Sequence, residues 1–277
     1  MHGLASHFAV AFLIVVAGCS SSEATPSGDP GTAGDSRGPD AGDSIDADLA
    51  GDGEVVPPGF ARLTGRAVQT SNKTKGVPAT VTAGTETATS DATGSWSIML
   101  PTAQPFSLVF TADGYATLTE ESATLTGNYE SGARPLIDRS IGQLLVGALP
   151  SFDSTLGMLA INVVAEPSCA NEDGATLTVT AGNKKTGGGA PGDPQLVYFV
   201  GGLPTPAATS AAKGMTPAAI AYNLPLGEVT VIAQHPSCAP VVPPVTQGPI
   251  TYHGTVEVVA AGTASSLALS FLRAFLD

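Results

Sequence analysis

The 277-residue sequence predicts an all-β fold, with two β-sandwiches joined by a short helix after a signal peptide and a disordered acidic linker. Two observations predict the sandwiches. From residue 61 onward, short runs rich in Val, Ile, Thr and aromatic residues alternate with Gly, Pro and Asp, a pattern typical of sandwich strands and their turns. Apolar residues at helical spacing occur in a single place after the signal.

The first segment, residues 1–18, is predicted to be a signal peptide. Residues 8–17 are apolar, a run too short for a bilayer, which needs about 20 residues, but suited to an export signal. The run ends in Val16-Ala-Gly-Cys19, which resembles the lipobox of bacterial lipoproteins. The resemblance implies cleavage after residue 18, a diacylglycerol on the Cys19 thiol and an acyl chain such as palmitate on its amine. A plain secretory signal with a chance cysteine is the alternative, because small residues are common at any cleavage site. Residues 1–7 also lack the Lys or Arg that export signals normally carry there.

Residues 19–58 are predicted to be the anchor residue and a disordered linker. Residues 20–58 hold nine acidic side chains against one basic side chain, Arg37, which accounts for −8 of the formal net charge of −13. Gly, Ser, Asp and Pro dominate this segment, so it buries too little apolar surface to offset the entropy of ordering. Treated as a flexible coil, it spans roughly 35 Å. The chain lacks the basic patch that nucleic acid requires, so no nucleic-acid partner is expected.

Residues 59–137 are predicted to form the first sandwich. Trp96 is its largest expected core side chain. Asp91 and Gly94 precede it at turn spacing, Asp91 to accept backbone N–H groups and Gly94 to supply a left-handed angle. The predicted strands are Leu63–Val68, Ala79–Ala83, Trp96–Leu100, Ser107–Thr111 and Ala116–Thr119.

This first module resembles the carboxypeptidase regulatory-like and Cna-B-like families. The matching segments, in order, are Gly65-Arg-Ala-Val68, Gly76-Val-Pro-Ala-Thr-Val81, Thr89-Ser-Asp-Ala-Thr-Gly-Ser-Trp96, Leu100-Pro101 and Asp113-Gly-Tyr115. The resemblance covers residues 62–126 and implies a prealbumin-like sandwich. Cna-B-like modules often join a first-strand lysine to Asn or Asp through an isopeptide bond. Arg66 stands on this strand instead, so no such crosslink is expected.

Residues 138–150 are predicted to form a linker helix between two domains. Ile141, Leu144, Leu145, Ala148 and Leu149 share one helical face. Asp138 or Ser140 can cap its start, and Pro150 ends the run.

Residues 151–277 are predicted to form the second sandwich. The segment Ile220–Pro225 echoes Trp96–Pro101, which suggests a diverged copy of the first module. The last two strands are expected to form a hairpin through Gly262. The predicted strands are Met158–Val164, Ala175–Thr180, Leu196–Val200, Ala218–Tyr222, Glu228–Ala233, Thr255–Val259 and Ser266–Phe271.

Cys169 and Cys238 are predicted to form a disulfide. Both occur in Pro-Ser-Cys-Ala, each follows a predicted strand, and export brings them into an oxidising compartment. The alternative is a metal site that recruits His235 and His253, although zinc usually takes ligands from two tighter clusters. We expect no bound metal and no cofactor.

The sequence contains no complete catalytic motif. Ser210-Ala-Ala-Lys213 and Lys185-Thr-Gly187 match penicillin-binding motifs only in isolation, with reversed order and short spacing. The sequence therefore favours a non-enzymatic lipoprotein of the outer membrane, with structural or protein-binding modules and an envelope protein or glycan as partner. The loop from Gly182 to Pro194 is a candidate contact surface. A carbohydrate-binding module is the alternative, with Phe60, Tyr115 and Tyr129 as candidate stacking residues, and an envelope enzyme is less favoured.

Overall fold

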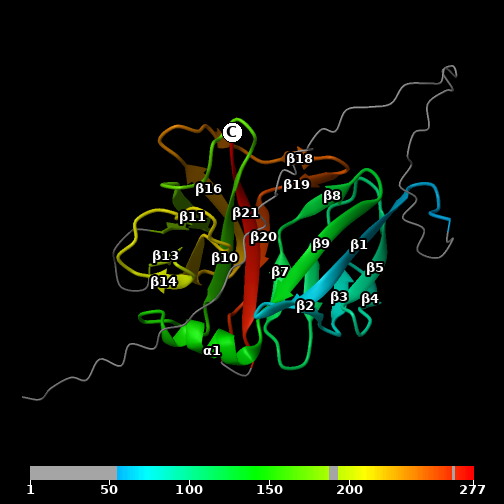
Figure 1. Cartoon of the computed structure of the whole chain (residues 1–277), viewed down its shortest axis with the longest axis horizontal. Helices are drawn as coiled ribbons and strands as arrows, with labels where there is room; N and C mark the ends of the chain where they lie inside the picture. The colour runs from blue at the N-terminus through cyan, green and yellow to red at the C-terminus, as the bar shows by residue number, and fades with distance from the viewer. Residues whose placement is uncertain (1–54, 187–192, 264–265) are drawn as a thin grey trace, which may run out of the picture. The chain divides into compact units, whose positions relative to one another are not determined.

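The computed structural model describes residues 55–186, 193–263 and 266–277. The predicted signal peptide, the anchor Cys19 and the linker up to residue 54 lie outside the described residues. In the part that is described, no helix has the length and apolar character to cross a bilayer. The described residues are mostly β-strand, with one short helix, α1 (Figure 1).

The strands before the helix supply the N-terminal half. They are β1 (Phe60–Gln69), β2 (Asn72–Gly76), β3 (Thr80–Ala83), β4 (Glu86–Thr89), β5 (Ser95–Pro101), β6 (Leu108–Thr111), β7 (Thr117–Glu120), β8 (Ala123–Leu125) and β9 (Tyr129–Leu136).

The helix and the strands after it supply the C-terminal half. They are α1 (Arg139–Gly147), β10 (Gly157–Ala165), β11 (Thr176–Ala181), β12 (Lys184–Lys185), β13 (Gln195–Val200), β14 (Leu203–Thr205), β15 (Ala219–Leu224), β16 (Gly227–Gln234), β17 (Pro240–Val241), β18 (Val245–Gln247), β19 (Ile250–Tyr252), β20 (Thr255–Val258) and β21 (Ala268–Leu276).

One ten-stranded sheet runs through both halves. Its order is β14-β13-β15-β10-β21-β7-β6-β3-β4, and β17 pairs with β21 beside this path. β15 is buried along its whole length, and β10 is buried over its first five residues. Both are near-continuous apolar runs, as expected for strands covered on both faces.

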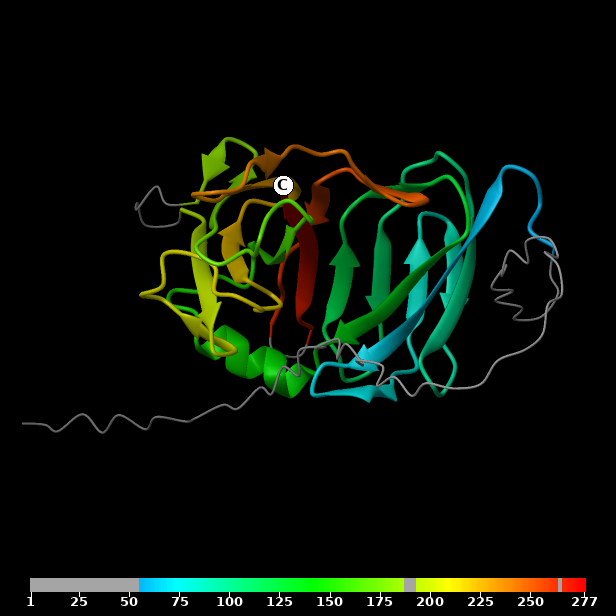
Figure 2. The same ribbon diagram turned by 45° about the horizontal axis from the view of Figure 1, so that its top comes forward.

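The C-terminal strand β21 joins the halves. It pairs in parallel with β10, from Leu159↔Ser270 onward, and in parallel with β7, from Ala268↔Thr117 onward. Figures 1 and 2 show it, in red, between the two sets of strands. The last strand of the chain therefore holds the first half and the second half in one sheet.

Two smaller sheets complete the sandwiches. β2-β1-β5, with β9 beside β1, shares a core with the N-terminal part of the long sheet, around Trp96, Phe106 and Phe110. β12-β11-β16-β20 shares a second core with the C-terminal part, around Val179, Val231 and Leu272. A third short sheet, β18-β19-β8, again pairs strands from the two halves.

The turn before β5 confirms the role expected of Asp91 and Gly94. The Asp91 carboxylate accepts the backbone N–H groups of Thr93 (2.8 Å) and Ser95 (2.9 Å). The Thr93 hydroxyl also donates to this carboxylate. The hydroxyl hydrogen bond, followed by the backbone ones, lowers the pKa of Asp91. Gly94 has φ of +83°, and a Cβ there would lie 2.0 Å from the Ala67 carbonyl oxygen. Trp96 is buried and meets Phe110 edge to face, with ring centroids 5.7 Å apart.

Helix α1 packs on the long sheet through only part of the predicted face. Asp138 caps it as expected, accepting the N–H of Ile141. Leu144, at 54% exposure, points away from the core, whereas Leu145, Val146 and Leu149 pack on it. The face is turned because Gly142 lies against Leu267, where a Cβ would come within 2.5 Å of Cδ2. Of the predicted face, Leu145 and Leu149 are confirmed and Ile141 is partly buried, whereas the prediction was wrong for Leu144 and Ala148, which are exposed.

The predicted hairpin at the end of the chain was also wrong. β20 pairs with β16 in the smaller sheet, whereas β21 pairs with β10 and β7 in the long one. The chain therefore ends β20 at Val258 in one sheet and begins β21 at Ala268 in the other.

The β-sandwich class is confirmed, but the connection between the halves differs from a simple helical linker. Residues 56–277 belong to one compact unit, and strand pairing crosses the region predicted as an inter-domain boundary. The boundaries at residues 137 and 151 stay a prediction.

Candidate functional site

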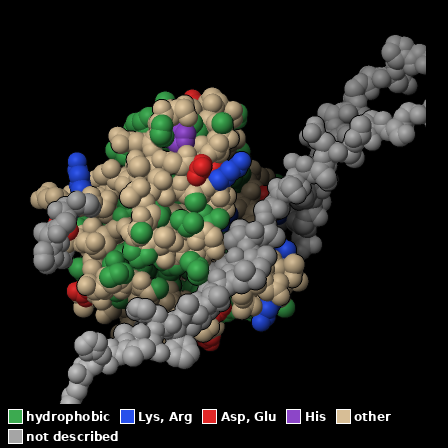
Figure 3. Space-filling view, turned by 60° about the vertical axis from the view of Figure 1, so that its left-hand side comes forward, with side chains coloured by type: hydrophobic (Ala, Val, Ile, Leu, Met, Phe, Trp, Pro, Cys, Tyr) green, Lys and Arg blue, Asp and Glu red, His purple; other side chains and the backbone are tan. Residues whose placement is uncertain are grey.

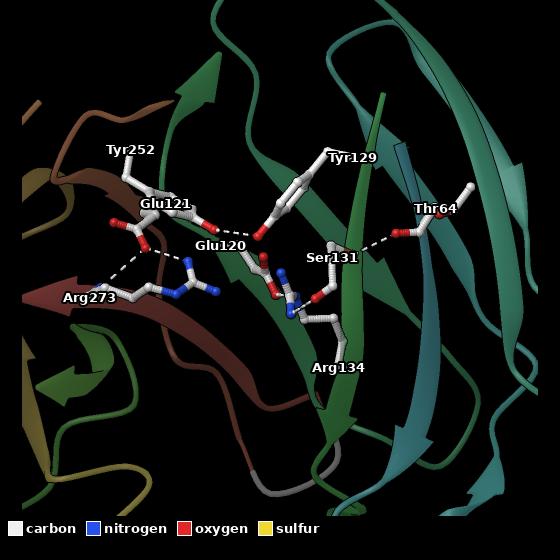
Figure 4. Close-up of polar contacts among 8 residues, drawn as sticks. All are labelled: Thr64, Glu120, Glu121, Tyr129, Ser131, Arg134, Tyr252 and Arg273. Carbon is white, nitrogen blue, oxygen red and sulfur yellow. Dashed lines mark hydrogen bonds and ion pairs between the residues drawn. The ribbon is translucent and has the colours of Figure 1, made fainter. Parts of the chain in front are cut away.

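A buried network of charged and aromatic side chains lies where the two halves meet. Glu120 ends β7, Glu121 follows it, Arg134 comes from β9, and Arg273 comes from β21 (Figure 4). Strand pairing positions them, because β21 runs parallel to β7 with Phe271 opposite Glu120.

Glu121 is bound to Arg273. Its Oε1 accepts the backbone N–H of Arg273 at 3.3 Å and lies 2.5 Å from Arg273 Nη1. Glu121 is 3% exposed, and burial raises its pKa to about 7 in spite of the neighbouring guanidinium. Its second oxygen, Oε2, has no hydrogen-bond partner among the described residues.

Aromatic rings enclose the Arg273 guanidinium. Its central carbon lies 4.6 Å from the centroid of the Tyr252 ring and 5.2 Å from that of Phe271, within the range of cation–π attraction. Burial alone lowers the pKa of Arg273, but the charges of Glu120 and Glu121 outweigh it and raise that pKa. Burial also raises the pKa of Tyr252.

The second ion pair extends the network to β1. Arg134 Nε lies 2.6 Å from Glu120 Oε1, and the Arg134 guanidinium donates to the Ser131 carbonyl. The Ser131 hydroxyl donates to the Thr64 carbonyl at 2.9 Å. Dashed lines in Figure 4 trace these contacts and the 3.5 Å approach of the Tyr129 and Tyr252 hydroxyls.

The geometry of this network favours a structural role. Glu120 and Glu121 each form an ion pair with an arginine on another strand, and no member of the network lines the 420 Å³ or the 190 Å³ surface hollow. A buried pair costs several kcal/mol when one partner is removed. The network therefore fixes β7, β9 and β21 relative to one another.

The Cys169–Cys238 disulfide is confirmed. The two Cα atoms are 5.4 Å apart, and the bond joins the segment after β10 to the segment after β16. A ring nitrogen of His235 and the two sulfur atoms all lie within 4.8 Å of one another. His253, the other histidine of the metal alternative, is not part of this group.

The open face of β12-β11-β16-β20 carries threonines and apolar side chains, together with the charged residues Lys185, Glu228 and Glu257. Along β16, Val229, Val231 and Ala233 enter the core, while the alternate residues are exposed. Thr180, Thr230 and Thr255 form one row across three strands.

Two apolar side chains and two acids stand on or beside this face. Leu226 and Ile232 are 55% and 51% exposed, and Glu228 lies directly opposite Glu257 on β20. A hollow of about 420 Å³ is lined by Thr180, Gly182, Leu226, Glu228 and Thr230. Figure 3, which brings the C-terminal half forward, shows apolar groups among uncharged polar surface with few charges.

Other predicted site residues have mixed outcomes. Cys19 lies outside the described residues, as do residues 187–192 of the Gly182–Pro194 loop. Of the aromatic residues suggested for sugar stacking, Phe60 is 43% exposed, whereas Tyr115 and Tyr129 are partly buried against the core.

The charged network was missed at the sequence level. Its visible signals are the adjacent acids Glu120-Glu121 at the end of a strand and a single arginine, Arg273, inside the apolar final strand. Neither signal shows from the sequence that Glu121 and Arg273 contact each other.

A scan against protein-family models gives no match, and a search of curated proteins finds no relative. Among solved structures, the chain resembles a type II cohesin–X-dockerin complex from Acetivibrio cellulolyticus, at 18% identity over 37% of this chain and 74% of that one, with TM-score 0.25. It also resembles the TIE protein of Bacillus anthracis, at 12% identity over 79% of this chain and 34% of that one, with TM-score 0.23. The shaft pilin SpaA of Lactobacillus rhamnosus GG matches at 10% identity over 79% of this chain and 97% of that one, with TM-score 0.21. At these scores, the fold assignment rests on the strand pairing itself.

Proposed function

We propose that the chain is a lipid-anchored cell-envelope protein whose β-sandwich unit makes non-catalytic contact with a protein partner. The observation that carries this proposal is the open face of β12-β11-β16-β20. There, Leu226 and Ile232 are more than half exposed beside rows of threonine and a hollow of about 420 Å³. Exposed apolar side chains are typical of the core of a protein interface, and charged side chains are typical of its rim.

The acids on this face favour a partner with a basic side chain. Glu228 and Glu257 are exposed and stand directly opposite each other on neighbouring strands. Like charges in this position destabilise the free sheet. A lysine or arginine of the partner, placed between the two carboxylates with its stem on Leu226, relieves that repulsion.

The sequence before the sandwich supports the envelope location. Cys19 ends a lipobox-like run, and the acidic linker after it would span roughly 35 Å if it behaves as a flexible coil. Ser20, in place of the aspartate often found in inner-membrane lipoproteins, favours the outer membrane by resemblance.

Fatty-acid labelling tests the anchor. Labelled palmitate should enter the wild-type protein and should not enter a Cys19→Ala variant, because the acylated residue is then absent. A Ser20→Ala variant serves as the control and should keep the label. Continued labelling of Cys19→Ala, or an unlabelled wild type, contradicts the anchor.

Site-specific crosslinking in intact cells tests the contact. A photoreactive residue at Ile232 should give a discrete adduct with one envelope protein, whereas the same residue at Thr87, exposed on the other half, should not. Equal adducts at both positions, or no adduct at Ile232, contradict the proposed surface. A glycan partner is less well supported, since two of its three candidate stacking residues are partly buried.

A further inference from the structure

We infer that Cys169, Cys238 and His235 form a zinc-binding site when their disulfide is reduced. The same three residues thus have two states, a covalent crosslink under oxidising conditions and a metal site under reducing ones. This inference is independent of the proposed protein partner.

The first observation is the distance among the donor atoms. The two sulfur atoms and a His235 ring nitrogen lie within 4.8 Å of one another. In tetrahedral zinc sites the Zn–S distance is about 2.3 Å and the Zn–N distance about 2.0 Å, which puts the donor atoms roughly 3.5 Å apart. Reduction lets the sulfurs separate toward that spacing, and the His235 nitrogen, within 4.8 Å of both sulfurs, has at most about 1.3 Å to close.

The second observation is the orientation of the imidazole ring. His235 Nε2 lies 2.7 Å from the Asp173 carbonyl oxygen. A carbonyl only accepts, so Nε2 carries the proton and Nδ1 keeps its lone pair. Nδ1 accepts the N–H of Ser237 over a long 3.2 Å. A backbone carbonyl that holds the distal ring nitrogen is the usual arrangement around a metal-bound histidine.

The third observation is access. A surface hollow of about 190 Å³ is lined by Gly174, Thr176, Gln234, His235 and Pro236. Cys169 is 5% exposed, whereas His235 and Cys238 are partly exposed. A metal ion can therefore approach from the histidine side, and three protein ligands leave a fourth position for water.

The chemistry balances with a dithiol as the reductant. The dithiol transfers two electrons and two protons to the Cys169–Cys238 bond and becomes a disulfide itself. Zn²⁺ then displaces the two thiol protons and binds two thiolates and one neutral imidazole, so its affinity falls as pH falls.

Metal titration of the full chain tests the inference. We would use the chain carrying Cys19→Ser, so that only Cys169 and Cys238 can react, and titrate Zn²⁺ and Co²⁺ after anaerobic reduction with a dithiol and removal of the dithiol and its disulfide. The reduced chain should bind one metal ion, and Co²⁺ should give a sulfur-to-metal charge-transfer band and intense tetrahedral visible bands. The oxidised chain should give neither.

Two variants separate this site from non-specific binding. His235→Ala should weaken Zn²⁺ binding at least about 10-fold, while His253→Ala, which removes a histidine outside the group, should leave it unchanged. Far-UV circular dichroism is recorded during the titration. If reduction unfolds the chain, the spectrum then shows whether Zn²⁺ binding refolds it. Absence of binding by the reduced chain, or equal effects of the two histidine variants, would overturn the inference.

Discussion

Glu121 carries an ionisable group where water does not reach it. Its folded pKa of about 7 lies above the ordinary value of 4.5, chiefly because of burial. A raised acid pKa means that the folded state binds the proton more tightly than the unfolded chain. The stabilising contribution is therefore complete below about pH 4.5 and is lost as pH rises to about 7.

Glu121→Gln should remove this dependence. Between pH 4.5 and 7, the free energy of unfolding of the wild type should fall by about 1–3 kcal/mol relative to the variant. Urea unfolding at several pH values measures it. Glu130→Gln, at an exposed position on β9, is the control and should give a curve parallel to the wild type. A wild type that gains stability relative to Glu121→Gln over this range shows instead that Arg273 dominates.

Single residues also show which roles could be predicted from the sequence and which could not. Asp91, Gly94 and Trp96 act through neighbours a few positions away, so their roles were predictable. The Glu121–Arg273 pair spans 152 positions, and no local pattern links such residues. The partner of a buried charge is set by sheet order, which periodicity does not encode.

At the scale of elements, the two glycines of α1 have opposite roles. A Cβ on Gly142 would come within 2.5 Å of Leu267 Cδ2, whereas a Cβ on Gly147 meets nothing within 4 Å. Alanine favours a helix over glycine by about 1 kcal/mol, but Leu267 is buried and has little room to move.

Gly142→Ala should therefore lower the free energy of unfolding by about 1–2 kcal/mol, since overpacking outweighs helix propensity. Gly147→Ala should raise it by about 0.5–1 kcal/mol. Thermal or urea unfolding of the matched pair measures both. Two shifts of the same sign contradict the close packing of α1 on the long sheet.

Element types were more predictable than their partners. The runs predicted as strands in both halves are strands. Their alternating or continuous apolar pattern depends on which faces are buried, and not on which strands pair with which. β9 was missed because its sequence contains Gly132 and Pro135, and it pairs in parallel with β1. The segments Trp96–Pro101 and Ile220–Pro225 look alike, yet β5 and β15 lie in different sheets.

At the scale of the whole molecule, β21 is the strand on which both halves depend. It lies between β10 and β7, its Phe275 enters the N-terminal core, and its Leu272 and Leu276 enter the C-terminal core. The β8–β19 pairing and the Arg273 contacts join the halves again. A partner on the open face would therefore contact one compact unit that contains both halves.

Equilibrium unfolding followed by two probes tests this most directly. Trp96, the single tryptophan, reports the N-terminal core through its fluorescence, and amide hydrogen exchange of Val179 and Val231 reports the C-terminal one. We predict a single transition, with coincident urea midpoints and equal opening free energies for both probes. Two separate transitions, with one half exchanging while the other stays protected, would contradict the joined unit.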